Sequence, residues 1–149
     1  MNACYLHITE LDSSGKKSRK QHKAQHSKYL EYAQSVAIRL EPAQSTLGLA
    51  EGLETALSAK AIYKCATWST MTAGFMSKFI APRGVEHLMI FADSDSNGTG
   101  HAAAFSCANK NLLNKNDVKR VTVIWPSSGD FNDVLIDGRD CFKWQLGEY

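Results

Sequence analysis

The sequence lacks the marks of a zinc-binding, secreted or membrane-spanning chain. Its four cysteines stand far apart and form no Cys-x-x-Cys pair, which argues against a zinc ribbon and offers no disulfide framework. No apolar run approaches the roughly 20 residues that a membrane-spanning helix requires, and the amino terminus has no signal-peptide core. We therefore expect free thiols, a cytoplasmic location and no membrane partner.

Acidic residues are missing from one stretch near the amino terminus, which makes the charge uneven. Residues 16–28 hold six of the 17 lysines and arginines and no acid, so the remaining 11 basic and 15 acidic residues give a net charge of −4. Such a segment either contacts nucleic-acid phosphates or is a solvated arm. The candidate nucleic-acid contacts are Lys16, Lys17, Arg19, Lys20 and Lys23.

The stretch that organises the chain is residues 88–100, where an apolar run ends abruptly in acids and glycines. A continuous apolar run is typical of a strand buried on both faces, and open α/β sheets bind ligands at the ends of such strands. Asp93 and Asp95 lie two apart, so in strand geometry they point to the same side. Close carboxylates repel unless a cation joins them, and hard oxygen ligands favour magnesium, manganese or calcium over zinc.

Three other interpretations of this stretch remain open. Asp, Ser, Asn and Gly are turn residues, and a polar loop after a core strand needs no chemistry. Residues 93–98 also match the first half of an EF-hand calcium loop, but Ala104 occupies the closing glutamate position and the preceding segment is strand-like. A phosphatase of the aspartyl-phosphate type also has Asp-x-Asp after an apolar strand, usually with Thr or Val where Asn97 stands.

The pattern along the chain predicts an α/β domain with an amino-terminal extension. Residues 4–11 and the turn cluster 12–15 indicate a short hairpin that runs into the basic segment. We assign residues 1–35 to the hairpin and basic segment and residues 36–149 to the α/β domain. The expected strands are residues 36–40, 47–51, 66–69, 88–93 and 120–125, and the expected helices are residues 53–61, 73–80 and 101–113.

Acidic residues follow three of the expected strands. Glu51 follows the first apolar run, Asp93 and Asp95 follow the central one, and Asp130 and Asp133 follow the last. Strands that alternate with helices form a mostly parallel sheet, whose strand ends share one edge. The acids should therefore converge, although Glu51 alone is equally explained as an acid at a helix amino terminus.

These motifs together resemble a Toprim domain, the catalytic fold of bacterial-type primases, topoisomerases and some nucleases. The resemblance covers residues 36–136 and rests on a strand ending in Glu-Gly (residues 47–52), a strand ending in Asp-x-Asp (residues 93–95) with Gly98 behind it, and the acidic motif 129–133. The version here is most similar to Toprim domains of phage- and plasmid-associated primases and primase-helicases. It implies a Rossmann-like, mostly parallel sheet flanked by helices.

The resemblance also implies a chemistry. Asp93, Asp95, Asp130 and Asp133 would hold magnesium or manganese ions, and Glu51 would be the catalytic acid or base or a bridging ligand. The implied reaction is primer synthesis from nucleoside triphosphates on a single-stranded DNA template. The alternatives are a Toprim nuclease and a non-catalytic module that binds metal or nucleic acid.

The sequence departs from the replicative primases in two ways. They tend to carry a further acid four residues after the glutamate, where this chain has Thr55, so a ligand is missing or supplied by Glu54. Neither the usual zinc-binding module nor a helicase accompanies the motifs. We expect an excised domain or a very short family member that works with zinc-binding and helicase modules of a parent protein or partner.

Overall fold

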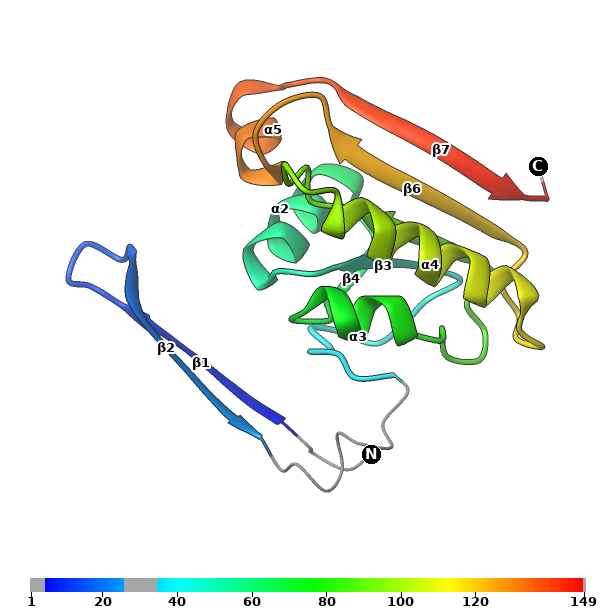
Figure 1. Ribbon diagram of the computed structural model, residues 1–149, viewed down its shortest axis with the longest axis horizontal. Helices are drawn as coiled ribbons and strands as arrows, with labels where there is room; N and C mark the ends of the chain where they lie inside the picture. The colour runs from blue at the N-terminus through cyan, green and yellow to red at the C-terminus, as the bar shows by residue number, and fades with distance from the viewer. Residues whose placement is uncertain (1–4, 26–34, 149) are drawn as a thin grey trace. The chain divides into compact units, whose positions relative to one another are not determined.

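The computed structural model describes residues 5–25 and 35–148, which fall into two compact units, residues 1–33 and 34–149 (Figure 1). The first unit is an antiparallel hairpin of β1 (Tyr5–Leu11) and β2 (Lys17–Gln25). Asp12 closes its turn by accepting hydrogen bonds from the backbone N–H groups of Ser14 and Lys16 at 2.8 and 2.9 Å. The predicted hairpin is confirmed, and four of the five candidate DNA contacts belong to β2.

The second unit is built on a five-stranded sheet in the order β4-β3-β5-β6-β7. Four neighbouring strands are parallel, and the last is antiparallel to β6. In chain order they are β3 (Thr46–Ala50), β4 (Ala66–Ser69), β5 (His87–Phe91), β6 (Arg120–Pro126) and β7 (Cys141–Gly147). The predicted α/β class with a mostly parallel sheet is confirmed.

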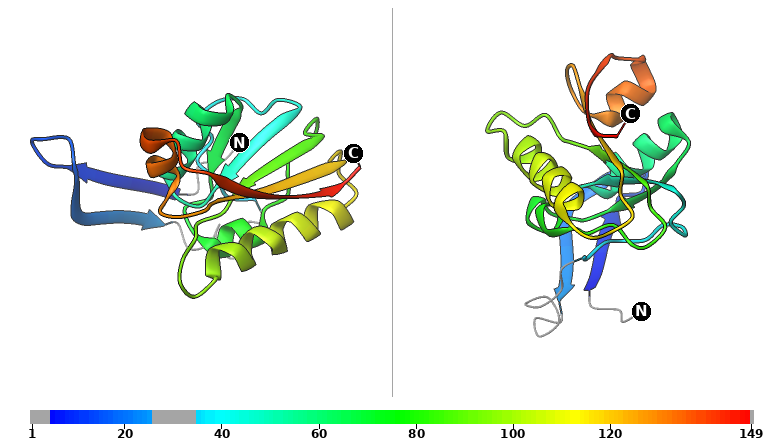
Figure 2. Two further views of the ribbon diagram at one scale, coloured as in Figure 1. Left: turned by 90° about the horizontal axis from the view of Figure 1, so that it is seen from above. Right: turned by 90° about the vertical axis from the view of Figure 1, so that its right-hand side faces the viewer.

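Helices cover both faces of this sheet, as Figure 2 shows. Those described are α2 (Leu53–Tyr63), α3 (Ala73–Lys78), α4 (Thr99–Leu113) and α5 (Phe131–Asp137). Helices α3 and α4 pack on the face that carries Leu49, Ile90 and Val123, whereas α2 and α5 pack on the face that carries Phe91 and Ile124. Because both faces are covered, the central strands read as unbroken apolar runs in the sequence.

Small side chains bring α4 close to the sheet. Ala103, Ala104, Cys107 and Ala108 are all buried on its inner side. Asn111 continues this side, and its amide donates to the carbonyl oxygen of Phe79 at 2.8 Å while its side-chain oxygen accepts from Ala81 N. The buried polar group is therefore satisfied and ties α4 to the segment that enters β5.

Three parts of the fold differ from the sequence prediction. The prediction of a strand at residues 36–40 is wrong, because this segment forms only one β-bridge, between Ile38 and Ser69. The guanidinium carbon of Arg39 lies 4.8 Å from the centroid of the Trp68 ring. Strand β7 and helix α5 were not predicted. Most of β7 is exposed or half-exposed, so it lacks the apolar run that marks the central strands.

No helix among the described residues is long and apolar enough to cross a bilayer.

Candidate active site

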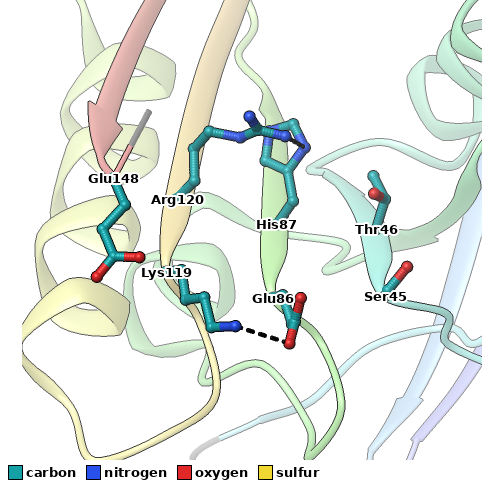
Figure 3. Close-up of a pocket in the computed structure, with 7 residues that line it drawn as sticks. All are labelled: Ser45, Thr46, Glu86, His87, Lys119, Arg120 and Glu148. Atoms are coloured by element: carbon teal, nitrogen blue, oxygen red, sulfur yellow. Dashed lines mark hydrogen bonds and ion pairs between the residues drawn. The ribbon is translucent and has the colours of Figure 1, made fainter.

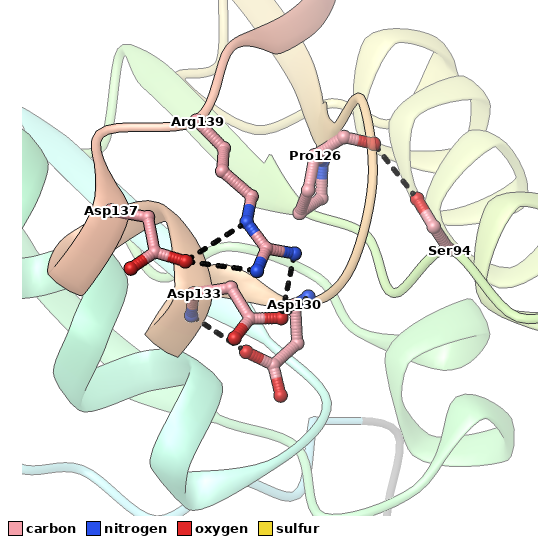
Figure 4. A network of polar contacts seen from close by, with 6 residues as sticks. All are labelled: Ser94, Pro126, Asp130, Asp133, Asp137 and Arg139. Atoms are coloured by element: carbon pink, nitrogen blue, oxygen red, sulfur yellow. Dashed lines mark hydrogen bonds and ion pairs between the residues drawn. The ribbon is translucent and has the colours of Figure 1, made fainter.

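The carboxyl ends of β3, β5 and β6 lie side by side because these strands are parallel neighbours. Glu51 comes directly after β3, Asp93 lies two residues after the end of β5, and Asp130 lies four residues after β6. Ser94 links two of these strand ends, since its hydroxyl donates to the carbonyl oxygen of Pro126 at 3.2 Å (Figure 4). The predicted acidic segments therefore share one edge of the sheet, which we call the carboxyl edge.

A tight loop leads from β5 into α4 and fixes the Asp-x-Asp motif. The Asp95 carboxylate accepts the backbone N–H of Gly100 at 3.0 Å, and Asn97 accepts that of Thr99 at the same distance. Gly98 has a φ of 73°, which suits glycine. A Cβ on Gly100 would come within 2.5 Å of the backbone oxygen of Asp93. Only glycine at residue 100 lets α4 begin against the Asp93 backbone.

Asp93 is half-buried and lies among like charges. Burial raises the pKa of its carboxyl group above the ordinary value, and the charges of Asp95 and Asp130 raise it further. The hydroxyl of Thr55 donates to Asp93 Oδ1 at 3.3 Å and acts in the opposite direction. Three acids from two loops thus influence one another, and nothing in this group neutralises their repulsion.

Asp130 and Asp133 belong to a different arrangement, shown in Figure 4. Asp130 caps α5 by accepting the backbone N–H of Asp133 at 2.9 Å, and Asp133 in return accepts that of Asp130 at 3.2 Å. Arg139 donates to Asp133 at 3.1 Å and to Asp137 at 2.9 Å. Asp133 already has a cationic partner, whereas no cation of the described residues forms an ion pair with Asp93. The spacing Asp-x-x-Asp is that of a capping box, and this signal could have predicted the structural role from the sequence.

The backbone of Glu51 is held by the end of the neighbouring strand. Its carbonyl oxygen accepts from the hydroxyl of Ser69 and from the N–H of Met71, both at 2.7 Å. Thr55 lies one helical turn further along the chain, in α2, where its hydroxyl reaches Asp93. Sequence reasoning treated Thr55 only as a missing acid and did not identify this contact.

The donor set at the carboxyl edge fits a hard divalent cation. Within the described part of the chain, no group of three or more His, Cys, Asp or Glu side chains is arranged so that it could hold a metal ion. Magnesium, however, is usually bound by one or two carboxylates together with waters and substrate phosphates. Asp93, whose carboxyl pKa is raised by burial and then by the charge of Asp95, and Asp95 itself provide two such carboxylates.

Comparison with known proteins agrees with this geometry. A family model described as Toprim domain matches residues 46–140, well over half of the chain. The chain belongs to the Toprim family. Toprim domains typically bind a divalent metal. All five predicted acids of the site lie inside the matched region, and the basic hairpin residues lie outside it.

A solved structure has the same fold as this Toprim chain. The crystal structure of a DNA primase domain from Pseudomonas aeruginosa matches with a TM-score of 0.54 and 14% sequence identity. The match covers 91% of this chain and 48% of the primase chain, so the Toprim chain spans about half the length of that protein. No curated protein matches the sequence.

Proposed function

We propose that this Toprim domain performs the metal-dependent nucleotidyl transfer of a DNA primase or primase-helicase, which joins nucleoside triphosphates on a single-stranded DNA template. The family match and the likeness to a primase domain support this proposal. The observation that carries it is the position of Asp93, Asp95 and Asp130 after the neighbouring parallel strands β5 and β6, whose ends are joined by the hydrogen bond from Ser94 to the carbonyl oxygen of Pro126.

In this proposal Asp93 and Asp95 hold magnesium or manganese, with Asp130 as the third carboxylate of the site. The metal, when bound, would neutralise the negative charge of the triphosphate. Asp95 keeps its orientation through Gly100 N, and Asp93 keeps its orientation through Thr55. Both carboxylates therefore present an oxygen from a fixed loop, which lowers the entropy lost when the cation and substrate bind.

Glu51 is the proposed general base or acid at the attacking or leaving hydroxyl. It follows β3, which is the strand next to β5. The hydrogen bonds that its carbonyl oxygen accepts from Ser69 and Met71 hold its backbone in place. Asp133 takes a positioning role in this proposal, because its carboxylate engages Arg139 and the start of α5. It holds Asp130 at the edge rather than binding the cation itself.

The basic residues of the hairpin are the proposed contacts for the DNA backbone. Each phosphate that they neutralise should contribute a slope of about −0.7 to the dependence of log affinity on log salt for single strands. Replacing Lys16, Lys17, Arg19 and Lys20 by Gln should flatten this slope. The matched control replaces four exposed basic residues of the second unit, Lys78, Arg83, Lys110 and Lys115. Equal slopes for the two quadruple variants would remove the hairpin from the DNA site.

A second candidate is a Toprim module that binds metal or nucleic acid without catalysis. The observation that favours it is Thr55, a neutral hydroxyl that contacts Asp93 at the position where replicative primases tend to carry another acid. Zinc-binding and helicase modules are proposed partners in either case. Positioning a template and two nucleotides is a separate requirement, worth about 7–11 kcal/mol in favourable cases. Activity should therefore be faint in this chain alone and rise when such modules are added.

The deciding experiment measures incorporation of labelled nucleotides on single-stranded DNA with manganese, with zinc-binding and helicase modules added to the chain. Glu51→Gln should abolish incorporation while manganese binding is largely retained. Primer synthesis that persists with both Glu51→Gln and Asp93→Asn would refute the primase proposal in favour of the non-catalytic module. Cleavage of the DNA in place of extension would identify a nuclease.

A further inference from the structure

A pocket of about 360 Å³ lies at the amino ends of β3, β5 and β6, the edge of the sheet opposite to the acids. We call it the amino-edge pocket. Figure 3 shows the residues that line it, among them Thr46 on β3, His87 on β5 and Arg120 on β6, with Glu86 and Lys119 at the strand ends. None of these residues belongs to the proposed nucleotidyl-transfer site.

Arg120 is the unusual group of this pocket. The hydrogen bond that its guanidinium makes is from Nη2 to Nδ1 of His87, at 3.1 Å. Its Nε atom is buried and has no hydrogen-bond partner, and no carboxylate of the described residues forms an ion pair with it. A buried donor without a partner is unfavourable, and a partly buried cation without a counter-charge is more so.

Neighbouring side chains hold Arg120 in place. Arginine always donates, so Nδ1 of His87 accepts, and the other ring nitrogen therefore carries the proton and donates to Thr122 Oγ1 at 2.8 Å. Burial lowers the pKa of His87, and the charge of Arg120 lowers it further, which keeps the ring neutral. Thr122 is buried in β6, and the chain Thr122, His87, Arg120 thus fixes the guanidinium before any ligand arrives.

The other charged side chains of the pocket are one lysine and two carboxylates. Lys119 forms an ion pair with Glu86 at 2.9 Å, and Glu148 also interacts with Lys119. Arg120 is therefore the cation of the pocket that forms no ion pair with a carboxylate of the described residues. The hydroxyl of Thr46, which forms no hydrogen bond within the described part of the chain, lies on the adjoining strand across His87 (Figure 3). The fixed guanidinium and the Thr46 hydroxyl both line the pocket and can donate hydrogen bonds to a ligand.

We propose that the amino-edge pocket binds a small ligand through an oxyanion, either a phosphate or a carboxylate group. Arg120 supplies the charge and the planar donor arrangement that suits both oxyanions, and Thr46 supplies a further donor. The carboxylates of Glu86 and Glu148 at the rim limit the ligand to one whose negative charge reaches past them to Arg120. This inference does not depend on the proposed nucleotidyl transfer at the other edge.

The test is a titration of the isotopically labelled chain followed by backbone amide NMR. The probes are inorganic phosphate, acetate and adenosine monophosphate, which separate phosphate from carboxylate and free phosphate from nucleotide-borne phosphate. At least one probe should shift the signals of Thr46, His87 and Arg120 to saturation in the wild type. Arg83→Gln, which removes an exposed arginine elsewhere, is the matched control and should behave like the wild type.

Arg120→Gln should weaken binding of that probe about tenfold or more, because it removes a charged hydrogen bond. Arg120→Lys keeps the charge and loses the planar arrangement of donors, so its affinity for the probe should lie between those of the wild type and Arg120→Gln. If Arg120→Gln gives the spectrum of an unfolded chain, Arg120→Lys and Thr46→Val replace it, and both should weaken binding. No shift with any probe in the wild type, or equal affinity in the folded variants, would overturn the proposal.

Discussion

Among the described residues, Asp93, Asp95 and Asp130 at the carboxyl edge of the parallel strands form no ion pair with a cation, and Arg120 at the amino edge forms none with a carboxylate. The same three strands, β3, β5 and β6, supply both edges. Each edge also holds a charge that does have a partner, Asp133 with Arg139 at the carboxyl edge and Glu86 with Lys119 at the amino edge.

The difference between paired and unpaired charges indicates which charged side chains are candidates for a binding site. A paired charge such as that of Asp133 can serve the fold alone, because its partner is already present. A fixed, partly buried charge without a partner is unfavourable for folding unless something outside the chain completes it. By this criterion the carboxyl edge favours a cation and the amino edge favours an anion.

The largest expected effect separates the two edges in catalysis. With zinc-binding and helicase modules added to the chain, Asp93→Asn should lower the rate of nucleotide incorporation by about 10²–10⁴-fold, the range expected when a group acting directly in the chemical step is lost. Asp117→Asn removes a carboxylate before β6, at the amino edge, and the new side chain can still accept from Gly84 N. Its rate should stay within about twofold of the wild type. Similar losses in the two variants would show that the carboxyl edge has no special role.

Packing at the carboxyl edge gives the next largest effect. Gly100→Ala would place a Cβ 2.5 Å from the Asp93 backbone oxygen and should lower the free energy of unfolding by about 1–3 kcal/mol. Gly74→Ala is the matched control, since Gly74 is likewise the second residue of its helix and its nearest atom would be 3.8 Å away. It should be neutral or stabilising by up to about 1 kcal/mol. Denaturant unfolding measures both variants, and equal stabilities would contradict the close approach of α4.

Asp133→Asn tests whether a paired acid is structural. The change weakens the ion pair with Arg139 and the capping box of α5, so the free energy of unfolding should fall by about 1 kcal/mol. Manganese affinity, measured by calorimetry, should change less than about threefold, because this carboxylate is not a proposed ligand. A loss of affinity as large as that of Asp93→Asn would return Asp133 to the ligand set.

The smallest expected effect is a gain of stability. The pKa of Asp93 is raised by folding, so its ionisation opposes folding once the pH exceeds that raised pKa and has no effect below the ordinary value of 3.8. Without metal, Asp93→Asn should therefore be about 0.5 kcal/mol more stable than the wild type at neutral pH. The difference should vanish in acid. Thermal unfolding across this pH range measures it, and a difference that grows on acidification would have the wrong sign.

The sequence predicted the central strands and the shared edge well, because buried parallel strands are continuous apolar runs and their polar ends are abrupt. This reasoning alone predicted that Glu51, Asp93 and Asp130 follow strands that end at the same edge of the sheet. It did not find β7, whose exposed residues leave only a weak pattern, nor the Arg139 partner of Asp133. Arg120 was also missed, since a basic residue at the start of a strand has no signal until its neighbours are known.

The most direct test of the contrast between the edges is a titration with Mn²⁺ followed by backbone amide NMR, because the ion broadens signals close to where it binds. The signals of Asp93, Asp95 and Asp130 should broaden first, while those of His87 and Arg120 at the other edge stay sharp. In Asp93→Asn/Asp95→Asn this selective broadening should disappear. Equal broadening at both edges, or the same selective broadening in the double variant, would contradict a cation site at the carboxyl edge.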